Sequence, residues 1–488
     1  MEDSPIAKLH RDLLWQIFAI NTTRTLDLPK IGQEFRTCSP YPSPLTTARH
    51  TSQVCASWRR LIIDSPSLWG NIIDLKSLHQ ESDAWRNEVL LRTGNSDLSI
   101  FGDIGGKGRQ HAKKFLEILL KNHWTRIQWV QVEFIGFDIE DSWSDSAWSA
   151  LGRPAPNLRF FSIHSDVVPY ICLTQGFILF ANHAPLLAHF QQNRLPMNLE
   201  ASWTSDLISL TLNLASNLKL SIFLETCSRM RSLQTLRLMF GRERRSPEDS
   251  LNYVIMPSLS TLVIQCPFDV SLAFLDHIKP APGCSLRLST NLTDIHSMDF
   301  VAAQRIIAKF THNYFCHRSA TSFRLSFNPK FIKVEDMRGF MVSIESVTTV
   351  PTFLSSLLLG TFEPAHTSGV KTLWVTTSAL IHIINLHNGD DQQRPFPQIK
   401  ILKWQPNLSP DCTSLIVNFL ASRRRLGMPI EIFDLTEWYP VCQHIPMDTK
   451  MLEEIPGLKV LWRDESDQGE VTLREYICGS GRPQVLPS

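Results

Sequence analysis

The sequence lacks the long apolar runs that place a protein in a membrane. No window reaches the ~18 uninterrupted apolar residues that a membrane-spanning helix requires, and the N-terminal apolar run from Leu13 to Ile20 carries a glutamine. The basic leader and the small-residue cleavage site of a signal peptide are missing too. We therefore expect an intracellular protein, cytoplasmic or nuclear, that has no membrane partner.

An excess of charge of one sign is also absent. The 488 residues include 48 basic and 47 acidic side chains, which gives a net charge of +1. Proteins that bind nucleic acid usually carry a clustered basic excess. The short basic runs at 242–245 and 423–425 are typical of solvated loops or helix ends. We expect no nucleic-acid partner.

Cysteine pairs at metal-binding or redox spacing do not occur. None of the ten cysteines forms a Cys-x-x-Cys motif, and Cys55, Cys227 and Cys266 stand in apolar surroundings. A free thiol in such surroundings behaves as a small hydrophobic side chain. This usage is typical of a reducing compartment.

Motifs that carry catalysis or hold a cofactor are missing as well. There is no Gly-x-Ser-x-Gly elbow, His-Glu-x-x-His helix or Gly-x-Gly-x-x-Gly fingerprint. The glycine-rich segment 102–108 has one residue too few for a phosphate loop, and Gly108 replaces the magnesium-binding hydroxyl. His312, Cys316 and His317 have no second ligand pair at zinc-finger spacing, which favours packing and surface roles. We expect neither an enzyme nor a cofactor or metal.

Two short amphipathic segments occur near the N-terminus. Residues 9–18 carry one apolar helical stripe, and Val54, Trp58, Leu61 and Ile62 recur at i, i+4, i+7 and i+8. Residues 21–46 between the segments are rich in proline and predict a mobile loop. Helices this short bury only a thin core. A small helical module with apolar side chains left over for a docking partner is expected.

The segments Leu9–Phe18, Val54–Arg59 and Ser65–Trp69 resemble an F-box. The chain most resembles F-box proteins with a C-terminal leucine-rich region, of the type abundant in mushroom-forming fungi. The resemblance covers residues 5–75 by specific residues and the remainder by pattern. His10 replaces the usual proline, and the insert 21–46 is longer than usual.

The resemblance implies a substrate-recognition subunit of an SCF-type cullin ubiquitin ligase. Such a subunit docks on the Skp adaptor, and through it on cullin, and holds an otherwise unknown target protein. The residues that the resemblance assigns to the adaptor are Leu9, Leu13, Leu14, Ile17, Phe18, Val54, Trp58, Leu61 and Trp69. Trp58 and Trp69 fit the adaptor interface and the module's own core equally well.

Beyond Leu75 the sequence alternates between strand-like and helix-like segments. A helix is expected at 110–122, strands at 97–100 and 126–134, and a further helix at 300–310. Strand-like pieces at 286–288, 323–327 and 357–359 follow an irregular spacing. Variants of Leu-x-x-Leu-x-Leu begin at Leu158, Leu207, Leu233, Leu259, Val370, Ile399 and Ile430, with a weaker copy at 187–190.

Most of these variants are spaced 26 to 31 residues apart. A period in the high twenties with one strand per unit is typical of leucine-rich repeats, in which stacked neighbours bury each other's strand face. The predicted fold class is therefore α/β: a helical module at 5–75, then an irregular leucine-rich-repeat solenoid, a horseshoe, at 85–478. Residues 479–488 are rich in Gly, Ser and Pro and predict a disordered tail.

Side chains between the repeat leucines point to the opposite strand face. In a horseshoe that face is open to ligands, so we expect target contacts from Arg237, Met239, Trp374, Lys403 and Gln405. The same alternation exposes Thr211, Asn213 and Gln265. For any single one of these residues, a solvated strand position is the more frequent case. The alternative for the whole chain is a repeat scaffold for protein interaction, with no ligase link and a degenerate F-box that caps it.

Overall fold

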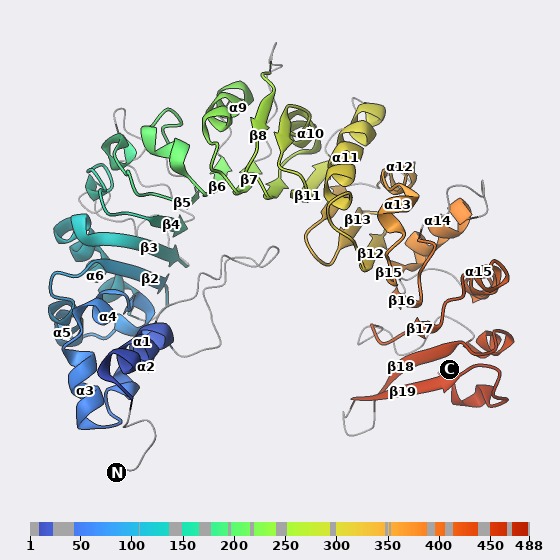
Figure 1. Cartoon of the computed structure of the whole chain (residues 1–488), viewed down its shortest axis with the longest axis horizontal. Helices are drawn as coiled ribbons and strands as arrows, with labels where there is room; N and C mark the ends of the chain where they lie inside the picture. The colour runs from blue at the N-terminus through green and yellow to red at the C-terminus, as the bar shows by residue number, and fades with distance from the viewer. Residues whose placement is uncertain are drawn as a thin grey trace. The chain divides into compact units, whose positions relative to one another are not determined.

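The chain is a mixed α/β protein with a large, mainly parallel set of strands, as seen in a computed structural model (Figure 1). The structure describes residues 9–22, 43–106, 108–135, 149–164, 177–193, 197–214, 219–240, 251–292, 299–346, 350, 353–387, 396–405, 413–437, 449–465 and 471–486. Two compact units are formed by Met1–Leu238 with Glu248–Ser258, and by Met239–Pro247 with Leu259–Ser488. None of the helices within these ranges is long and apolar enough to cross a membrane.

Unit 1 begins with four short helices that pack together: α1 (Arg11–Thr22), α2 (Pro44–Thr51), α3 (Ala56–Ile63) and α4 (Pro66–Gly70). Phe18 of α1 lies edge-on to Trp58 of α3, with 4.9 Å between the ring centroids. Pro44 and Pro66 open their helices, where a missing N–H costs nothing. The predicted loop 21–46 is therefore helical at both ends, and its middle, 23–42, lies outside the described residues.

Trp69 joins these helices to the rest of unit 1. Its Nε1 donates a hydrogen bond to the Ile62 carbonyl at 2.8 Å, and the ring is 1% exposed. Trp85, on α5 (Ala84–Arg92), packs edge-on at 6.3 Å, and the Arg92 guanidinium lies 4.5 Å from the Trp69 ring. Trp69 therefore belongs to the core.

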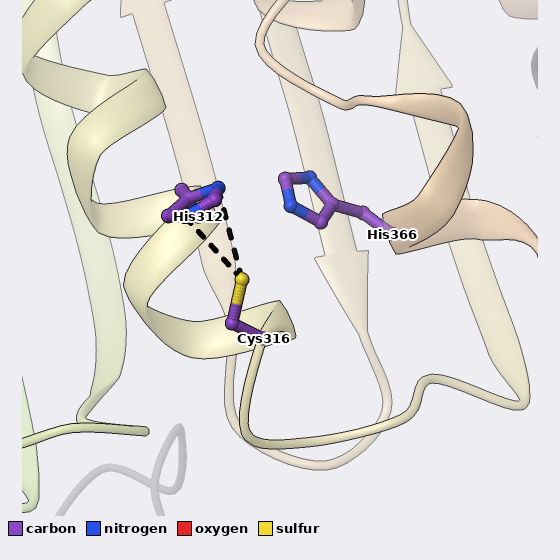
Figure 2. A group of neighbouring side chains, drawn as sticks. All are labelled: His312, Cys316 and His366. Carbon is purple, nitrogen blue, oxygen red and sulfur yellow. Dashed lines mark hydrogen bonds between the residues drawn. The ribbon is translucent and has the colours of Figure 1, made fainter.

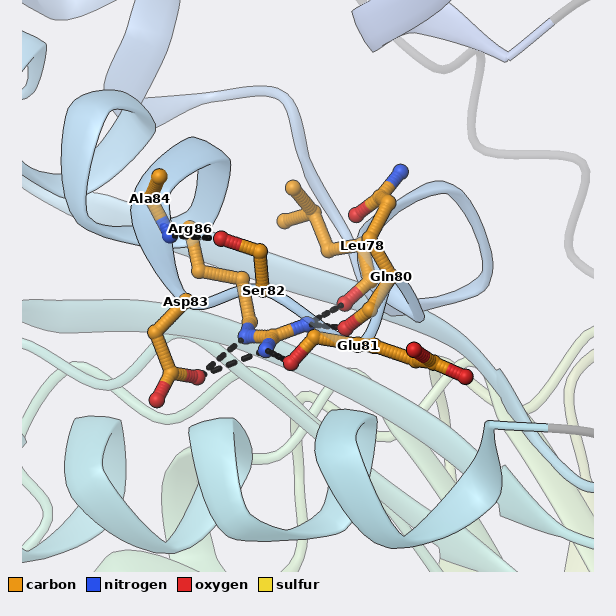
Figure 3. A network of polar contacts seen from close by, with 7 residues as sticks. All are labelled: Leu78, Gln80, Glu81, Ser82, Asp83, Ala84 and Arg86. Carbon is orange, nitrogen blue, oxygen red and sulfur yellow. Dashed lines mark hydrogen bonds and ion pairs between the residues drawn. The ribbon is translucent and has the colours of Figure 1, made fainter.

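A buried arginine fixes the segment that leads into α5. Arg86 is 1% exposed and donates to the carbonyls of Leu78, Gln80 and Glu81 and to the Asp83 carboxylate, so one side chain holds the whole turn (Figure 3). The hydrogen bond from Arg86 holds the pKa of Asp83 below its usual value. Such a network satisfies backbone groups that the turn would otherwise leave unpaired.

The strands of unit 1 form a parallel ladder in chain order: β1 (Ile73–Asp74), β2 (Leu98–Ile104), β3 (Ile127–Phe134), β4 (Phe160–His164), β5 (His189–Asn193) and β6 (Ser209–Leu214). β7 (Thr235–Phe240) leads into unit 2, and β8 (Val254–Met256) belongs to unit 1. One register row, every member of it buried, runs across the ladder: Ile73, Ile100, Val130, Phe161, Phe190 and Leu210.

Helical segments connect the strands of unit 1 and cover the buried row: η2 (Leu75–Leu78), α6 (Arg109–Asn122), η3 (Trp124–Arg126), η5 (Leu179–Asn182), η6 (Ser202–Asp206) and α9 (Leu220–Arg229). α6 buries one apolar stripe, which includes Phe115, Leu116 and Leu119. The helix expected at 110–122 and the strand expected at 126–134 are confirmed.

Unit 2 has the strand order β9 (Thr261–Gln265), β11 (Ser285–Leu292), β14 (Met341–Ser346), β13 (Phe331–Asp336), β12 (Ser322–Phe327), β15 (Thr372–Thr376), β16 (Ile401–Gln405), β17 (Ile432–Asp434), β18 (Lys459–Glu465) and β19 (Val471–Ile477). β13 is antiparallel to both of its neighbours, and β19 is antiparallel to β18. The inserted meander β12–β13–β14 explains the irregular sequence spacing between residues 284 and 365.

The helices of unit 2 lie along one side of its strands (Figure 1): α10 (Phe268–Asp276), α11 (Phe300–Phe315), α12 (Phe353–Leu359), α13 (Pro364–Thr367), α14 (Thr377–His387) and α15 (Thr413–Arg425). The short elements β10 (Ile278–Pro280), η8 (Thr449–Glu454) and η9 (Pro483–Val485) complete the unit. The expected helix at 300–310 and the expected strands at 286–288 and 323–327 are confirmed.

Two predictions in unit 2 are wrong. Residues 357–359 end helix α12 rather than forming a strand, because a short apolar run fits either structure and Leu354 and Leu358 are buried at helical spacing. Residues 479–486 are not a disordered tail. The Gly481 N–H donates to Glu453 at 2.8 Å, the Arg482 N–H donates to the Tyr476 hydroxyl at 2.9 Å, and Leu486 is buried.

Candidate functional site

An apolar stripe on α1 stays uncovered among the described residues. Leu13, Ile17 and Ile20, at i, i+4 and i+7, are 49%, 40% and 73% exposed. Val54, in the turn between α2 and α3, is 61% exposed. Solvent-exposed apolar side chains gathered on a single helix face mark an interaction surface more often than scattered ones do.

The residues predicted to contact an adaptor fall into three groups. Leu13, Ile17 and Val54 are exposed. The partly buried members are Leu9, Leu14 and Trp58, and the buried members are Phe18, Leu61 and Trp69. The buried three present almost no surface to a partner. Ile20 was missed by the sequence prediction, although the same helical spacing extends to it.

A second candidate surface is the solvent-facing side of the unit 2 strands. Trp374 of β15 stands between two cations on neighbouring strands: Arg324 of β12, 5.7 Å from the ring, and Lys403 of β16, 5.2 Å from it. Strand register places these three side chains in one row. Cations within about 6 Å of an indole ring are attracted to its face. The Trp374 Nε1 is buried and has no hydrogen-bond partner among the described residues.

Acidic side chains neutralise part of this row. Lys403 pairs with Asp434 at 3.0 Å, and Glu335 pairs with Lys333 at 2.9 Å and with Arg324 at 3.8 Å. The same row continues through Met341 to Arg287 on β11. Burial lowers the pKa of Arg287, and the nearby carboxylates of Glu335 and Asp336 act in the opposite direction.

The row beside it consists largely of small hydroxyl side chains. Ser343 and Ser326 are opposite Lys333 on the two strands that flank it, Ser289 is opposite Ser343, and Thr376 is opposite Gln405. We call these two rows, from β11 to β17, the Trp374 face. It combines a floor of small hydroxyl groups with long cationic side chains: Arg287, Arg324, Lys333 and Lys403.

The predicted target-contacting residues are only partly brought together. Trp374, Lys403 and Gln405 lie on the adjacent strands β15 and β16. Arg237 and Met239 lie on β7, outside the Trp374 face, and both are partly buried. Of the other residues expected to be exposed, Gln265 is exposed and Asn213 is partly buried.

Thr211 is 5% exposed, so the prediction that it is exposed is wrong. It lies opposite Gln191 of β5, and its side chain is buried. Sequence reasoning missed Arg324 and Lys333, because the repeat pattern fails in the β12–β13–β14 meander. The alternation in Ser322–Phe327 and Phe331–Asp336 was the available signal.

The corresponding face of unit 1 has a different character. Trp129 of β3 and Phe160 of β4 stack at 3.8 Å with an interplanar angle of 5°, and His189 of β5 lies 5.9 Å from Phe160. Burial lowers the pKa of His189. An adjacent row is polar and uncharged at Gln131, Ser162, Gln191 and Thr211.

Within the described residues, side chains that could hold a metal gather at His312, Cys316 and His366. His317, which the sequence places beside them, instead bonds the Asn313 carbonyl at 3.0 Å. In the glycine-rich segment, Gly102 lies inside strand β2, and Gly108 caps α6 with φ +80°. Lys107 of that segment lies outside the described residues.

Two comparisons with known proteins found no match. No family model matches the chain, and no curated protein matches it significantly. Any functional interpretation therefore depends on the residues themselves.

Proposed function

We propose that this protein is the substrate-recognition subunit of an SCF-type cullin ubiquitin ligase. Residues 5–75 act as its F-box, and residues 85–478 act as a leucine-rich-repeat solenoid that holds the target. The observation that carries the proposal is the exposed stripe of Leu13, Ile17 and Ile20 on α1. A helical module with a thin core that leaves such a stripe uncovered is suited to docking on another protein.

The proposed role requires no catalytic group in this chain. Docking on the Skp adaptor tethers the bound target beside a charged ubiquitin-conjugating enzyme on the same complex. The target lysine then reacts as if its concentration were greatly raised. An adaptor interface of standard size buries roughly 1,600 Å² in total, and exposed apolar side chains such as Leu13 and Ile17 would contribute its centre.

The direct test measures binding of the purified full chain to the purified Skp adaptor by isothermal titration calorimetry. The double variant Leu13→Asp and Ile17→Asp places two charges in the stripe, and we expect at least a tenfold loss of affinity. Leu91→Asp is the matched control, because Leu91 is 76% exposed on α5 of the same unit. Circular dichroism checks that each variant is folded. Equal affinity of the double variant and the original chain would contradict the proposal.

A target segment rich in acidic residues suits the Trp374 face best. Its two rows carry four cationic side chains against the two carboxylates of Glu335 and Asp434. Electrostatic complementarity of this kind guides partner choice and speeds encounter, while Trp374 offers an aromatic surface for an apolar side chain of the target.

The second candidate is a repeat scaffold without any ligase link. It is favoured by the hydrogen bonds that tie the helical cluster to the strands. Ser99 and Gln128 both donate to the Asn71 side chain, at 3.1 and 3.0 Å, so the cluster also caps the ladder. A scaffold predicts no adaptor binding at all, whereas a ligase subunit predicts co-purification with Skp adaptor and cullin.

A further inference from the structure

Three side chains with metal-binding chemistry converge on the helical side of unit 2 (Figure 2). His312 lies in the last turns of α11, and Cys316 follows four residues later, at the end of the same helix and on the same face. His366 of α13 comes from a segment 50 residues further along the chain and points toward this pair. The three ligand atoms all lie within 4.8 Å of one another.

The distances within the group approach those of a tetrahedral site. The Cys316 Sγ lies 3.7 Å from the His312 Nδ1, which is also the nitrogen nearest the Glu363 carboxylate. Zinc at its usual bond lengths of about 2.0–2.3 Å separates neighbouring ligand atoms by about 3.3–3.7 Å. Only a small side-chain adjustment is therefore needed to close all three donors around one ion.

Glu363 offers a fourth donor. Its Oε1 lies 3.6 Å from the His312 Nδ1, and its Oε2 lies 3.6 Å from the His366 Nε2. Glu363 is the residue before α13, so its carboxylate and His366 belong to one tight turn. Two imidazoles, one thiolate and one carboxylate supply two negative charges, which match a divalent cation.

His366 gives independent evidence for a ligand. The residue is 6% exposed, and its buried Nε2 has no hydrogen-bond partner among the described residues. A buried polar atom without a partner is rare and costly.

We propose that His312, Cys316, His366 and Glu363 form a binding site for a zinc-like divalent cation. With four protein ligands the site is closed and structural, and it pins the end of α11 to the turn that begins α13. This site does not depend on adaptor docking and can be present whether or not the chain joins a ligase.

Metal binding changes the protonation of two ligands. The Cys316 thiol releases its proton to solvent, so affinity rises with pH. The His366 Nδ1 accepts the Glu363 N–H at 3.2 Å. Ligation through Nε2 moves the ring proton to Nδ1 and therefore replaces that hydrogen bond with the metal bond.

The test loads the purified full chain with Zn²⁺ or Co²⁺ under reducing conditions. The variants Cys316→Ser and His312→Asn change exposed side chains, so they are expected to fold, and His366→Asn removes the buried ligand. His317→Asn is the matched control, since this neighbour bonds the Asn313 carbonyl instead. The readouts are bound metal per chain after dialysis, cobalt–thiolate absorption, and the melting temperature with and without zinc.

The original chain and His317→Asn should each bind one more equivalent of zinc than Cys316→Ser. Both should show the cobalt–thiolate absorption band and melt at a higher temperature with zinc. Cys316→Ser should lack that band and the zinc-dependent shift, and His312→Asn should bind at least tenfold more weakly. Equal zinc content and equal melting shifts in all variants would overturn the proposal, as would cobalt binding without a thiolate band.

Discussion

The two units use the same kind of strand ladder for different surfaces. Each buries one apolar row, such as Phe161 with Phe190 in unit 1 and Leu373 with Leu402 in unit 2. The opposite row is aromatic and uncharged in unit 1, where Trp129 stacks on Phe160. In unit 2 it is cationic around Trp374. The buried row maintains the fold, and the opposite row is therefore free to differ between the units.

The largest expected effect is a difference in stability between variants in the buried row of unit 1 and variants in the opposite row. Phe161→Ala removes a fully buried ring and should lower the free energy of unfolding by about 3–5 kcal/mol. Trp129→Ala acts on the partly exposed face and should cost about 1–2 kcal/mol, mostly from the lost stack. Urea denaturation of both variants measures the difference. Equal losses of unfolding free energy would show that the Trp129 row contributes as much to stability as the buried row, which would contradict this division of roles.

The next prediction compares the buried arginines of the two units. Arg86→Met in unit 1 leaves three carbonyls of the 78–81 turn without their donor and should cost about 3 kcal/mol. Among the described residues, Arg423 in unit 2 bonds the Phe396 and Pro397 carbonyls, and its Nε and Nη1 have no hydrogen-bond partner there. Burial lowers the pKa of Arg423 to about 10.

Arg423→Met should therefore change the free energy of unfolding by less than about 1 kcal/mol, because removing an incompletely paired buried charge offsets the lost bonds. Denaturant titration of the two variants side by side measures the contrast. A loss for Arg423→Met as large as that for Arg86→Met would mean that hydrogen bonds to two carbonyls suffice to hold a buried guanidinium.

A smaller effect is expected for binding at the Trp374 face. A fluorescein-labelled polyglutamate peptide serves as a probe for an acidic target segment. The double variant Arg324→Gln and Lys403→Gln should weaken its binding by about tenfold, which corresponds to about 1.4 kcal/mol, and the salt dependence should fall. Gln131→Ala and Gln191→Ala, at uncharged positions of a strand row in unit 1, are the controls. If fluorescence anisotropy gives the same peptide affinity for the charge variant and the original chain, the cationic side chains of the Trp374 face do not attract acidic segments.

Features that depend on local periodicity could be predicted from the sequence, whereas features that depend on long-range contacts could not. Apolar periodicity predicted the buried rows, since every predicted repeat anchor from Leu158 to Ile430 is buried. The same periodicity predicted the helical stripe on α1. The contact between Arg324 and Trp374 could not be predicted, because it depends on how β12 pairs with β15. No local sequence pattern reveals that pairing. The position of His366 beside Cys316 could not be predicted either, because the two residues are 50 positions apart in the sequence.

The smallest expected effect concerns the pH dependence of stability in unit 1, where His189 lies beside Phe160. Burial holds the pKa of His189 in unit 1 below its ordinary value of 6.5. As the pH falls below 6.5, the unfolded chain therefore binds more protons than the folded chain, and unit 1 loses stability until the lowered folded-state pKa is passed. His189→Gln should make the unfolding free energy of this unit less dependent on pH in that window. An unchanged pH dependence would show that His189 titrates normally.

We propose above that the exposed stripe on α1 docks on the Skp adaptor. Hydrogen–deuterium exchange of the full chain, with and without a saturating amount of purified adaptor, tests it most directly. We predict slower exchange in residues 11–22 and in the turn at Val54, with α5 around Leu91 unchanged. Exchange in α1 that is the same with and without the adaptor would contradict the claim.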